Sequence, residues 1–312
     1  ELQTALKDYL TIRRQLGYKL RDEKSLLPKF IRFMEQQGAS FITRDLALSW
    51  AMQPKNVLPA WWAKRLSMVR KFAQYLSAGD TRTEIPPQGL LPYHYRRRSP
   101  DIYRDEQIKQ LIEAAQQLPS PIGLRPYTYS TLFGLIAVTG MRMGESIRLK
   151  CEEVDFKNGI LTINDTKFGK SRLVPIHPTT CVALRTYIHQ RDKRYPALTT
   201  PSFFVSDQGR RIKKAAIWSA FVRLTDLVGL ARDSDRRRPR LHDLRHTFAV
   251  KTLVRWYREG RDVEQKLPVL STYLGHSRVA HPYWYLSAVP ELLELARTRL
   301  EQRLEGAQHE SA

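Results

Sequence analysis

The sequence predicts a mainly α-helical protein in two domains, with a small antiparallel β-sheet inside the second domain, an α+β arrangement. Apolar residues recur at helical spacing along most of the 312 residues. The period changes to two only over 154–176, around Asn158-Gly159, a strong hairpin signal. Proline and glycine are dense over 86–102, between two helical blocks. These three observations give the fold class and the order of its parts.

Residues 1–85 are expected to form a helical domain. Apolar stripes predict four helices, at 2–12, at 26–33, from 43 onward and at 61–76. The fourth helix has a second face that is basic and contains Lys64, Arg65, Arg70 and Lys71. Such a face binds a DNA backbone or is simply solvated, and both interpretations fit this stretch.

Residues 86–102 are expected to be the linker between the domains. The stretch contains Pro86, Pro87, Gly89, Pro92 and Pro100. Proline and glycine at this density are typical of an interdomain linker. The linker also contains the basic run Arg96, Arg97 and Arg98, which we expect to lie along phosphates, with plain solvation as the alternative.

Residues 103–312 are expected to form the second domain. Helices are predicted at 101–117, 127–138, 141–149, 179–192, 217–228, 242–258, 265–274 and 290–304, with a short one beginning at 282 or 284. A hairpin over 154–163 and a third strand at 172–176 make the sheet. The last helix has one apolar stripe, formed by Leu293, Ala296, Leu300 and Leu304.

The charge balance is the largest compositional signal. The chain has 52 Lys and Arg against 31 Asp and Glu, a net charge of +21. A basic protein of this size usually binds a polyanion, most often nucleic acid. There is no apolar run long enough to span a membrane, and we expect no secretory signal. The two cysteines, Cys151 and Cys181, suggest reduced thiols, so we expect a cytoplasmic, nucleoid-associated protein.

Two helix starts in the second domain carry candidate phosphate ligands. Arg142 follows a long apolar helix, and Glu145 lies on the same face and can hold its guanidinium in place. His242 and Arg245 share a helix face at a spacing of three. His246 is four residues from His242, which resembles half a zinc site. The glutamate that follows the first histidine in zinc protease helices is missing, so we favour a packed residue and expect no metal.

Two further candidates lie in turns and short segments. Lys167 is in the turn of a predicted hairpin, where it is solvated or reaches into a DNA groove to donate a proton; Lys170 and Arg172 are rivals for that role. His276 follows Leu274-Gly275, and Tyr283 and Tyr285 come shortly after. Two side chains that are two positions apart on a helix point about 200° away from each other, so only one of these tyrosines can face a given phosphate.

Together these residue types suit phosphoryl transfer without a metal. Guanidiniums bind non-bridging phosphate oxygens in bidentate fashion. Histidines donate hydrogen bonds and move protons near neutral pH. A tyrosine hydroxyl attacks as a covalent nucleophile, and a lysine protonates the departing oxygen. Most of the rate enhancement then comes from positioning and electrostatic stabilisation.

The order of these motifs resembles the tyrosine recombinases, the phage integrase family. The resemblance covers about 103–300 and lies in TGMRMGE, TKFGKSRLVP, LHDLRHTFA and LGHSRVAHPYWYL. Four motifs in this order are a specific signal for the family, whereas any one of them alone would be a weak signal. The N-terminal helices resemble, less closely, the core-binding domain of that family.

The resemblance implies a role for each residue. The scissile phosphate would be bound by Arg142, His242 and Arg245, with His276 as a fourth contact. Lys167 would be the general acid, and Tyr285 the nucleophile that forms a 3′-phosphotyrosyl link. No metal, ATP or other cofactor would be needed. The family also implies a two-domain clamp on duplex recombination sites, a homotetramer in the synapse with a monomer or dimer when free, and a docking C-terminal helix at 290–304.

One departure from the family pattern lies beside the tyrosine. His281-Pro282 stands where the family usually has a small polar residue, and proline removes a backbone donor. Tyr283 is therefore the rival nucleophile, although the nine-residue spacing from His276 favours Tyr285.

The expected function is a site-specific recombinase or integrase for integration, excision or transposition of a mobile element. The alternatives are a type IB topoisomerase-like nicking and resealing enzyme, or a DNA-binding regulator without catalysis.

Overall fold

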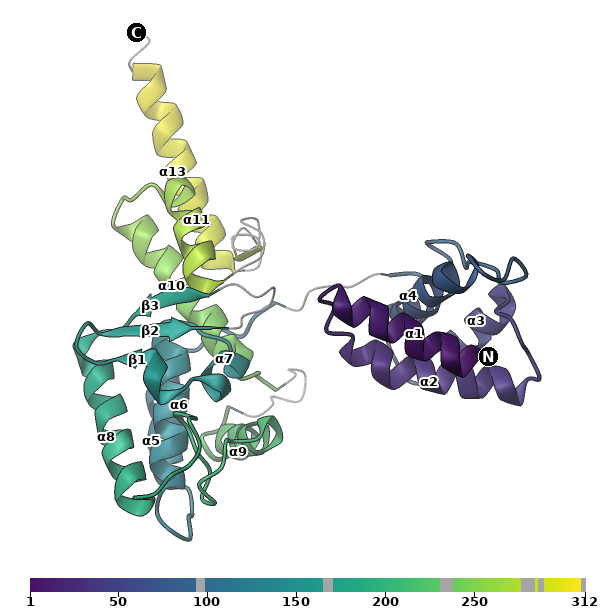
Figure 1. Cartoon of the computed structure of the whole chain (residues 1–312). Helices are drawn as coiled ribbons and strands as arrows, with labels where there is room; N and C mark the ends of the chain where they lie inside the picture. The colour runs from purple at the N-terminus through teal and green to yellow at the C-terminus, as the bar shows by residue number, and fades with distance from the viewer. Residues whose placement is uncertain (94–98, 165–170, 231–237, 276–283, 286–288, 310–312) are drawn as a thin grey trace. The chain divides into compact units, whose positions relative to one another are not determined.

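The computed structural model describes the chain except for 94–98, 165–170, 231–237, 276–283, 286–288 and 310–312, and except for the side chains of residue 21 and of 302–309. The chain divides into two compact units, Glu1–Arg98 and Ser99–Ala312. The boundary between them falls inside the stretch 86–102 that the sequence assigned to a linker. The two units are described separately (Figure 1).

The N-terminal unit is built from four helices, as the apolar stripes predicted. They are α1 (Leu2–Gln15), α2 (Arg21–Gln36), α3 (Arg44–Met52) and α4 (Pro59–Leu76). Thr43 caps α3 by accepting a hydrogen bond from the Leu46 backbone N–H at 3.3 Å. Phe30 and Trp50 meet edge to face in the core, with ring centroids 5.1 Å apart.

The second unit is mainly helical with a three-stranded antiparallel sheet, which confirms the predicted fold class. Its helices are α5 (Asp105–Gln116), α6 (Arg125–Thr139), α7 (Met143–Arg148), the 3₁₀ turn η1 (Cys151–Glu153), α8 (Pro178–Arg194), α9 (Lys214–Leu227), α10 (His242–Arg258), α11 (Val263–Leu274) and α13 (Pro290–His309). Its strands are β1 (Val154–Asp155), β2 (Ile160–Ile163) and β3 (Arg172–Pro175). Among the described helices, none has both the length and the apolar character needed to cross a membrane.

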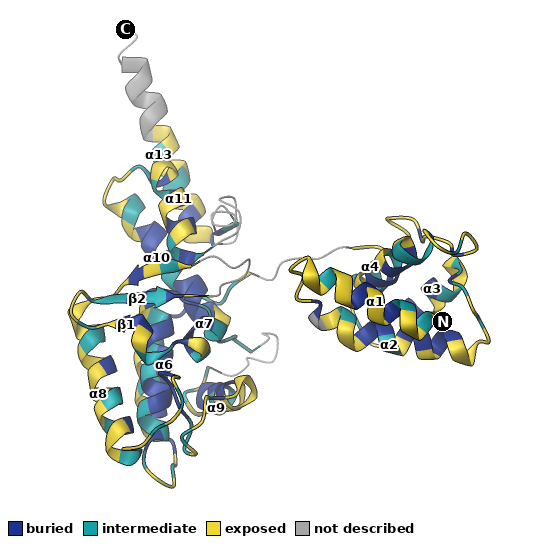
Figure 2. Cartoon of the chain, viewed as in Figure 1, coloured by how far each residue is buried: buried dark blue, intermediate teal, exposed yellow. Residues whose placement is uncertain are grey.

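Helix α6 is the central helix of this unit and positions the first motif. Its residues are largely buried, and it packs against α5, α8 and α10 (Figure 2). The helix ends at Gly140, whose φ of +61° favours glycine. A Cβ at Gly140 would lie 2.6 Å from Phe248 and 2.9 Å from Leu274. The chain therefore turns tightly here, and Arg142 becomes the N-cap residue of α7.

The sheet brings β3 next to the end of α11. The strand order is β1-β2-β3, and the β2–β3 register pairs Ile163 with Arg172. Strand β3 contacts α11, so Arg172 begins its strand close to the residues that precede His276. The connection between β2 and β3 carries Lys167 and Lys170, which lie outside the described residues.

Helices α10, α11 and α13 share a separate apolar cluster. This cluster includes Leu253, Leu270, Tyr285 and Leu292. Helix α13 extends to His309, beyond the predicted end at 304. Its buried face contains Leu292, whereas Leu293 and Leu300 are exposed. The predicted stripe is thus not the face that packs within this unit, because Leu292 and its neighbour Leu295 take that place.

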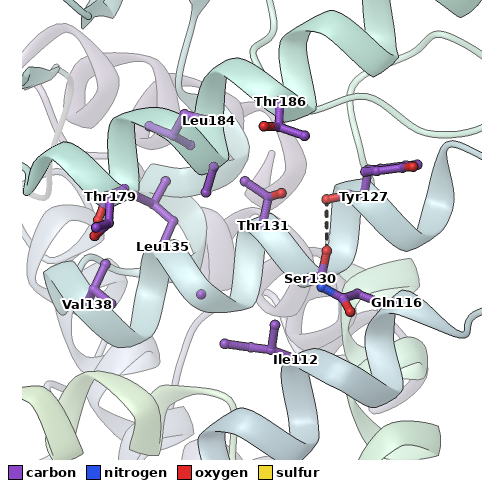
Figure 3. A pocket seen from close by; sticks show the side chains of 13 residues that line it. Ile112, Gln116, Tyr127, Ser130, Thr131, Leu135, Val138, Thr179, Leu184 and Thr186 are labelled. Carbon is purple, nitrogen blue, oxygen red and sulfur yellow. Dashed lines mark hydrogen bonds between the residues drawn. The ribbon is translucent and has the colours of Figure 1, made fainter.

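A mostly apolar groove of about 350 Å³ lies between α5, α6 and α8 (Figure 3). Leu135 and Val138 of α6 line it opposite Leu184 of α8. The residues that line it include no charged side chain, so the groove is not suited to bind a phosphate.

Candidate active site

The carboxylate of Glu145 joins two arginines from different motifs. Its Oε1 accepts hydrogen bonds from Arg142 Nη1 at 2.7 Å and Arg172 Nη1 at 3.2 Å. Its Oε2 accepts from the backbone N–H of Arg142 at 2.9 Å and from Arg172 Nη2 at 2.7 Å. Burial by itself would raise the pKa of Glu145, but the hydrogen bonds and charges of the two arginines lower it to about 2. Glu145 is therefore ionised at neutral pH, and the expected contact with Arg142 is present.

Both arginines also donate to the backbone that ends α11. Arg142 Nη2 donates to Gly275 O at 2.7 Å, and Arg172 Nε donates to Tyr273 O at 2.7 Å. Gly275 has a φ of +65°, and a Cβ there would lie 2.7 Å from Arg172 Nη1. Only glycine leaves room for this packing, so the Leu-Gly-His motif is partly a steric requirement of the two arginines.

Arg245 is the most buried of the site's arginines, at 1% exposure. Its Nη1 donates to Gly140 O at 2.7 Å, and its Nη2 donates to Leu274 O at 2.6 Å. Burial and then the charge of Arg142 lower the pKa of Arg245 to about 9. The motifs that contain Gly140, Arg245 and Leu274 are far apart in the sequence, and they meet around this one guanidinium.

Among the described residues, this cluster of three guanidiniums has one carboxylate that pairs with it, that of Glu145. Arg142, Arg172 and Arg245 carry three positive charges, and Glu145 carries one negative charge. Buried charge is costly unless it is paired, and backbone carbonyls compensate only in part. The remaining positive charge would be balanced by an anion, and guanidiniums match the geometry of phosphate oxygens.

Two histidines of α10 lie beside a tyrosine from the segment that follows α11. The rings of His242 and His246 are 4.6 Å apart and edge to face. His246 Nδ1 lies 2.8 Å from the Tyr285 hydroxyl oxygen, and both residues are buried. Burial of the ring, followed by the charges of His246 and Arg245, lowers the pKa of His242 far below its usual value. His242 is thus a neutral hydrogen-bonding group at physiological pH.

The remaining predicted site residues divide into two groups. Lys167, Lys170, His276 and Tyr283, with Arg96, Arg97 and Arg98, lie outside the described residues. Arg172 was expected to contact DNA or to rival Lys167, and this expectation does not fit its placement. Its side chain is only 8% exposed, because Glu145 and the Tyr273 carbonyl hold it inside the domain.

The basic face of α4 is less uniform than its sequence suggests. Arg65 is buried, stacks on Trp50 at 3.6 Å and donates to Trp50 O at 2.6 Å, so the expected DNA contact does not fit it. Arg70 donates to the carbonyls of Pro86 and Pro87. These hydrogen bonds connect the segment that follows α4 to the helix. Lys64 is exposed and pairs with Asp22, and Lys71 is exposed.

Sequence reasoning did not find the role of His246. The four-residue spacing from His242 resembled half a zinc site, and we favoured a packed residue; His246 is indeed buried, but its contact with the Tyr285 hydroxyl was not predicted. The two residues are 39 positions apart, and no local spacing signals such a pair.

Comparisons with known proteins identify the family of the chain. The model of the phage integrase family matches residues 102–291, more than half of the chain. The chain therefore belongs to the phage integrase family, the tyrosine recombinases, which are DNA breaking–rejoining enzymes.

Individual relatives match over nearly the whole length. The chain is 47% identical over 305 residues to y4rB of Sinorhizobium fredii, named as an integrase/recombinase, covering 96% of this chain and 97% of that relative. It is 27% identical over 274 residues to the tyrosine recombinase XerD of Vibrio cholerae, covering 86% and 85%. The fold matches the Tn1549 transposon integrase in complex with circular intermediate DNA, with a TM-score of 0.67, 16% identity, and 96% and 99% coverage.

Proposed function

We propose that this protein is a site-specific DNA recombinase that cuts and rejoins strands through a 3′-phosphotyrosyl link to Tyr285. The observation that carries the proposal is the excess positive charge of the arginine cluster next to a buried tyrosine. A phosphodiester is an anion that guanidiniums bind well, and its transition state gains further negative charge.

The placement of the described groups supports part of this chemistry, and the roles of Lys167 and His276 rest on the resemblance to the family. A guanidinium has five N–H donors, so Arg142 and Arg245 can hold backbone carbonyls and still bind non-bridging oxygens. Neutral His242 donates a further hydrogen bond. Tyr285 attacks phosphorus, and Lys167 protonates the departing 5′-oxygen, with His276 as another phosphate contact. The energy of the broken bond stays in the phosphotyrosyl link, so rejoining needs no ATP.

The proposed partner is duplex DNA carrying recombination sites. Each subunit has one nucleophile and cuts one strand, and two duplexes have four strands, so a full exchange needs four subunits. The exposed residues Leu293 and Leu300 of α13 offer an apolar face for docking on a neighbouring subunit. The helical N-terminal unit, with Lys71 exposed, would bind the duplex as the second half of a clamp.

The biological setting we propose is a mobile element. The relative y4rB is named as an integrase/recombinase, and the matched Tn1549 protein is a transposon integrase. Integration, excision or transposition of such an element would take place on chromosomal DNA, so we propose a cytoplasmic, nucleoid-associated protein. The net charge of +21 suits that location.

The nucleophile is tested by trapping the covalent intermediate. The full chain is incubated with a pool of nicked duplexes that carry a randomised central segment, and adducts that resist detergent are recovered and sequenced. We expect an adduct with the wild-type protein and with Tyr283→Phe, and none with Tyr285→Phe, because the phenyl ring lacks the attacking oxygen.

Two outcomes would contradict the proposal. An adduct that persists in Tyr285→Phe and vanishes in Tyr283→Phe would move the nucleophile. Efficient relaxation of supercoiled DNA that lacks the recovered site would favour a topoisomerase, because a recombinase depends on its site.

A further inference from the structure

The hydroxyl of Tyr285 is bonded to a histidine to which the reaction above gives no role. His246 Nδ1 lies 2.8 Å from Tyr285 Oη, a normal distance for a strong hydrogen bond. The His246 ring is fixed on several sides, with ring centroids 4.6 Å from His242, 5.6 Å from Trp284 and 5.5 Å from Tyr285. The imidazole is therefore held in one orientation toward the tyrosine oxygen.

We propose that His246 is a catalytic residue that accepts the hydroxyl proton of Tyr285 during strand cleavage, an inference that rests on the proposed function. As Tyr285 Oη forms its bond to phosphorus, the O–H bond breaks and the proton passes to Nδ1 of His246. The bond from phosphorus to the 5′-oxygen breaks, and its electron pair leaves with that oxygen, which the general acid protonates. In rejoining, the former general acid takes the proton of the attacking 5′-hydroxyl, the bond from phosphorus to the tyrosine oxygen breaks, and His246 returns its proton to that oxygen.

Burial makes a protein proton acceptor necessary. Tyr285 is 1% exposed and His246 is 5% exposed, so bulk water does not reach the hydroxyl in this arrangement. A phenol is a weak nucleophile at neutral pH until its proton is removed. Within the described part of the chain, His246 places an imidazole nitrogen within hydrogen-bonding distance of that hydroxyl, and histidine is the commonest general base in enzymes.

Three other described ionisable groups near His246 and the tyrosine suit this role less well. The ring of His242 contacts that of His246, and the proposed function uses His242 to bind phosphate. Arg245 is a guanidinium that stays protonated and already donates to two carbonyls. Asp243 is buried and bound by Arg240 at 2.8 Å, so its carboxylate is already paired. Arg245 instead favours the product of the transfer, because Tyr285 lies close enough for the phenolate charge to raise the pKa of Arg245.

The same hydrogen bond has an opposite interpretation. A bond to a buried partner would equally hold the tyrosine away from DNA until the complex forms. The two interpretations predict opposite effects when His246 is replaced. Loss of a proton acceptor slows cleavage, whereas loss of a restraint speeds it.

The test measures single-turnover adduct formation by the full chain on the nicked duplex recovered from the pool. His246→Asn places an amide nitrogen where Nδ1 lies, which keeps a hydrogen bond but cannot take a proton at neutral pH. We expect a rate loss of about 100-fold, within the usual range for a general base. The matched control is His189→Asn, at an exposed histidine of α8, which should react at the wild-type rate.

A second arm separates proton transfer from packing. Position 285 is replaced by trifluorotyrosine, whose phenol loses its proton more readily and depends less on a base. The ratio of wild-type to His246→Asn rates should then shrink from about 100 to about 10 or less. Thermal unfolding and DNA-binding measurements verify that the variants fold. If His246→Asn does not fold, His246→Gln, which fills more of the ring volume, replaces it.

Each outcome decides the proposal. The same rate loss with both tyrosines would reduce His246 to a packing residue, and an unchanged or faster rate in His246→Asn would overturn the base assignment. If the wild-type protein forms no adduct with any member of the pool, the proposed function itself fails. That result is distinct from an adduct that forms through Tyr285 but does not depend on His246.

Discussion

Buried arginines occur in both units of the molecule, and their surroundings differ. In the N-terminal unit, Arg65 stacks on the ring of Trp50 and donates to the Trp50 carbonyl. In the second unit, three guanidiniums share one carboxylate and several backbone carbonyls. Both regions satisfy the rule that buried charge must be paired or hydrogen-bonded.

The difference lies in how the positive charge is balanced. An aromatic face and a carbonyl stabilise the single cation of Arg65, which therefore joins α4 to α3 as a structural contact. Arg142 and Arg245 instead lie close enough that the charge of Arg142 lowers the pKa of Arg245. A cluster whose members repel one another is stabilised by an anion. We therefore expect uncompensated charge to distinguish a ligand site from a buried structural arginine such as Arg65.

The largest expected effect comes from making the same substitution in both regions. Arg245→Lys keeps the charge but loses the planar fork of donors, so adduct formation should fall by about 10³-fold. Arg65→Lys loses the stack on Trp50 and the guanidinium geometry, so the free energy of unfolding should fall by about 1–3 kcal/mol. Single-turnover cleavage and denaturant unfolding, measured on both variants, give the comparison.

Cleavage by the folded fraction of Arg65→Lys should match the wild type. If Arg65→Lys reduced that rate as strongly as Arg245→Lys does, the distinction between the structural and ligand-binding arginines would be wrong.

A smaller effect is expected from the carboxylate that holds two of the arginines. Glu145→Gln keeps the shape but removes the charge that fixes Arg142 and Arg172, and misplaced phosphate ligands should slow cleavage by about 100-fold. The measurement is single-turnover adduct formation, with Glu152→Gln on the exposed side of η1 as the matched control.

The stability of Glu145→Gln should depend on pH differently from that of the wild type. The pKa of Glu145 is lowered from 4.5 to about 2, so its stabilising effect is complete above about pH 4.5 and is lost as the pH falls through about 2. Unfolding measured from pH 6 to pH 2 should therefore show a weaker loss of stability on acidification in Glu145→Gln than in the wild type. An equal pH dependence in both proteins would show that the arginines do not hold the carboxylate ionised.

The smallest expected effect concerns a surface cation of the N-terminal unit. Lys71→Gln removes an exposed charge from α4, and the slope of log affinity against log salt should decrease by about 1. Arg65→Gln, which also removes a charge, should leave that slope unchanged in the folded protein because residue 65 is buried. DNA binding titrated at several salt concentrations tests both. A slope that changes with residue 65 and not with residue 71 would reverse our assignment of the binding face.

The sequence predicted the elements of the fold and the local part of the site. The apolar spacing gave the helices around Arg142 and His242, and the Asn-Gly turn gave the hairpin. A spacing of three predicted that Glu145 would contact Arg142, because residues three apart share a helix face. It did not predict which face of α13 packs, since the Leu292 and Leu293 stripes are both apolar and only the neighbouring helices select one.

By itself, the sequence determined which chemistry-bearing residues the chain has and in what order, because helix periodicity and turn signals depend on near neighbours. The tertiary structure alone decided which of them meet. Arg172 is 27 positions from Glu145, and His246 is 39 positions from Tyr285, so no local pattern encodes either contact. Burial decided the rest, since it turned Arg65 into a structural contact and brought the guanidiniums of the second unit close enough for their charges to interact.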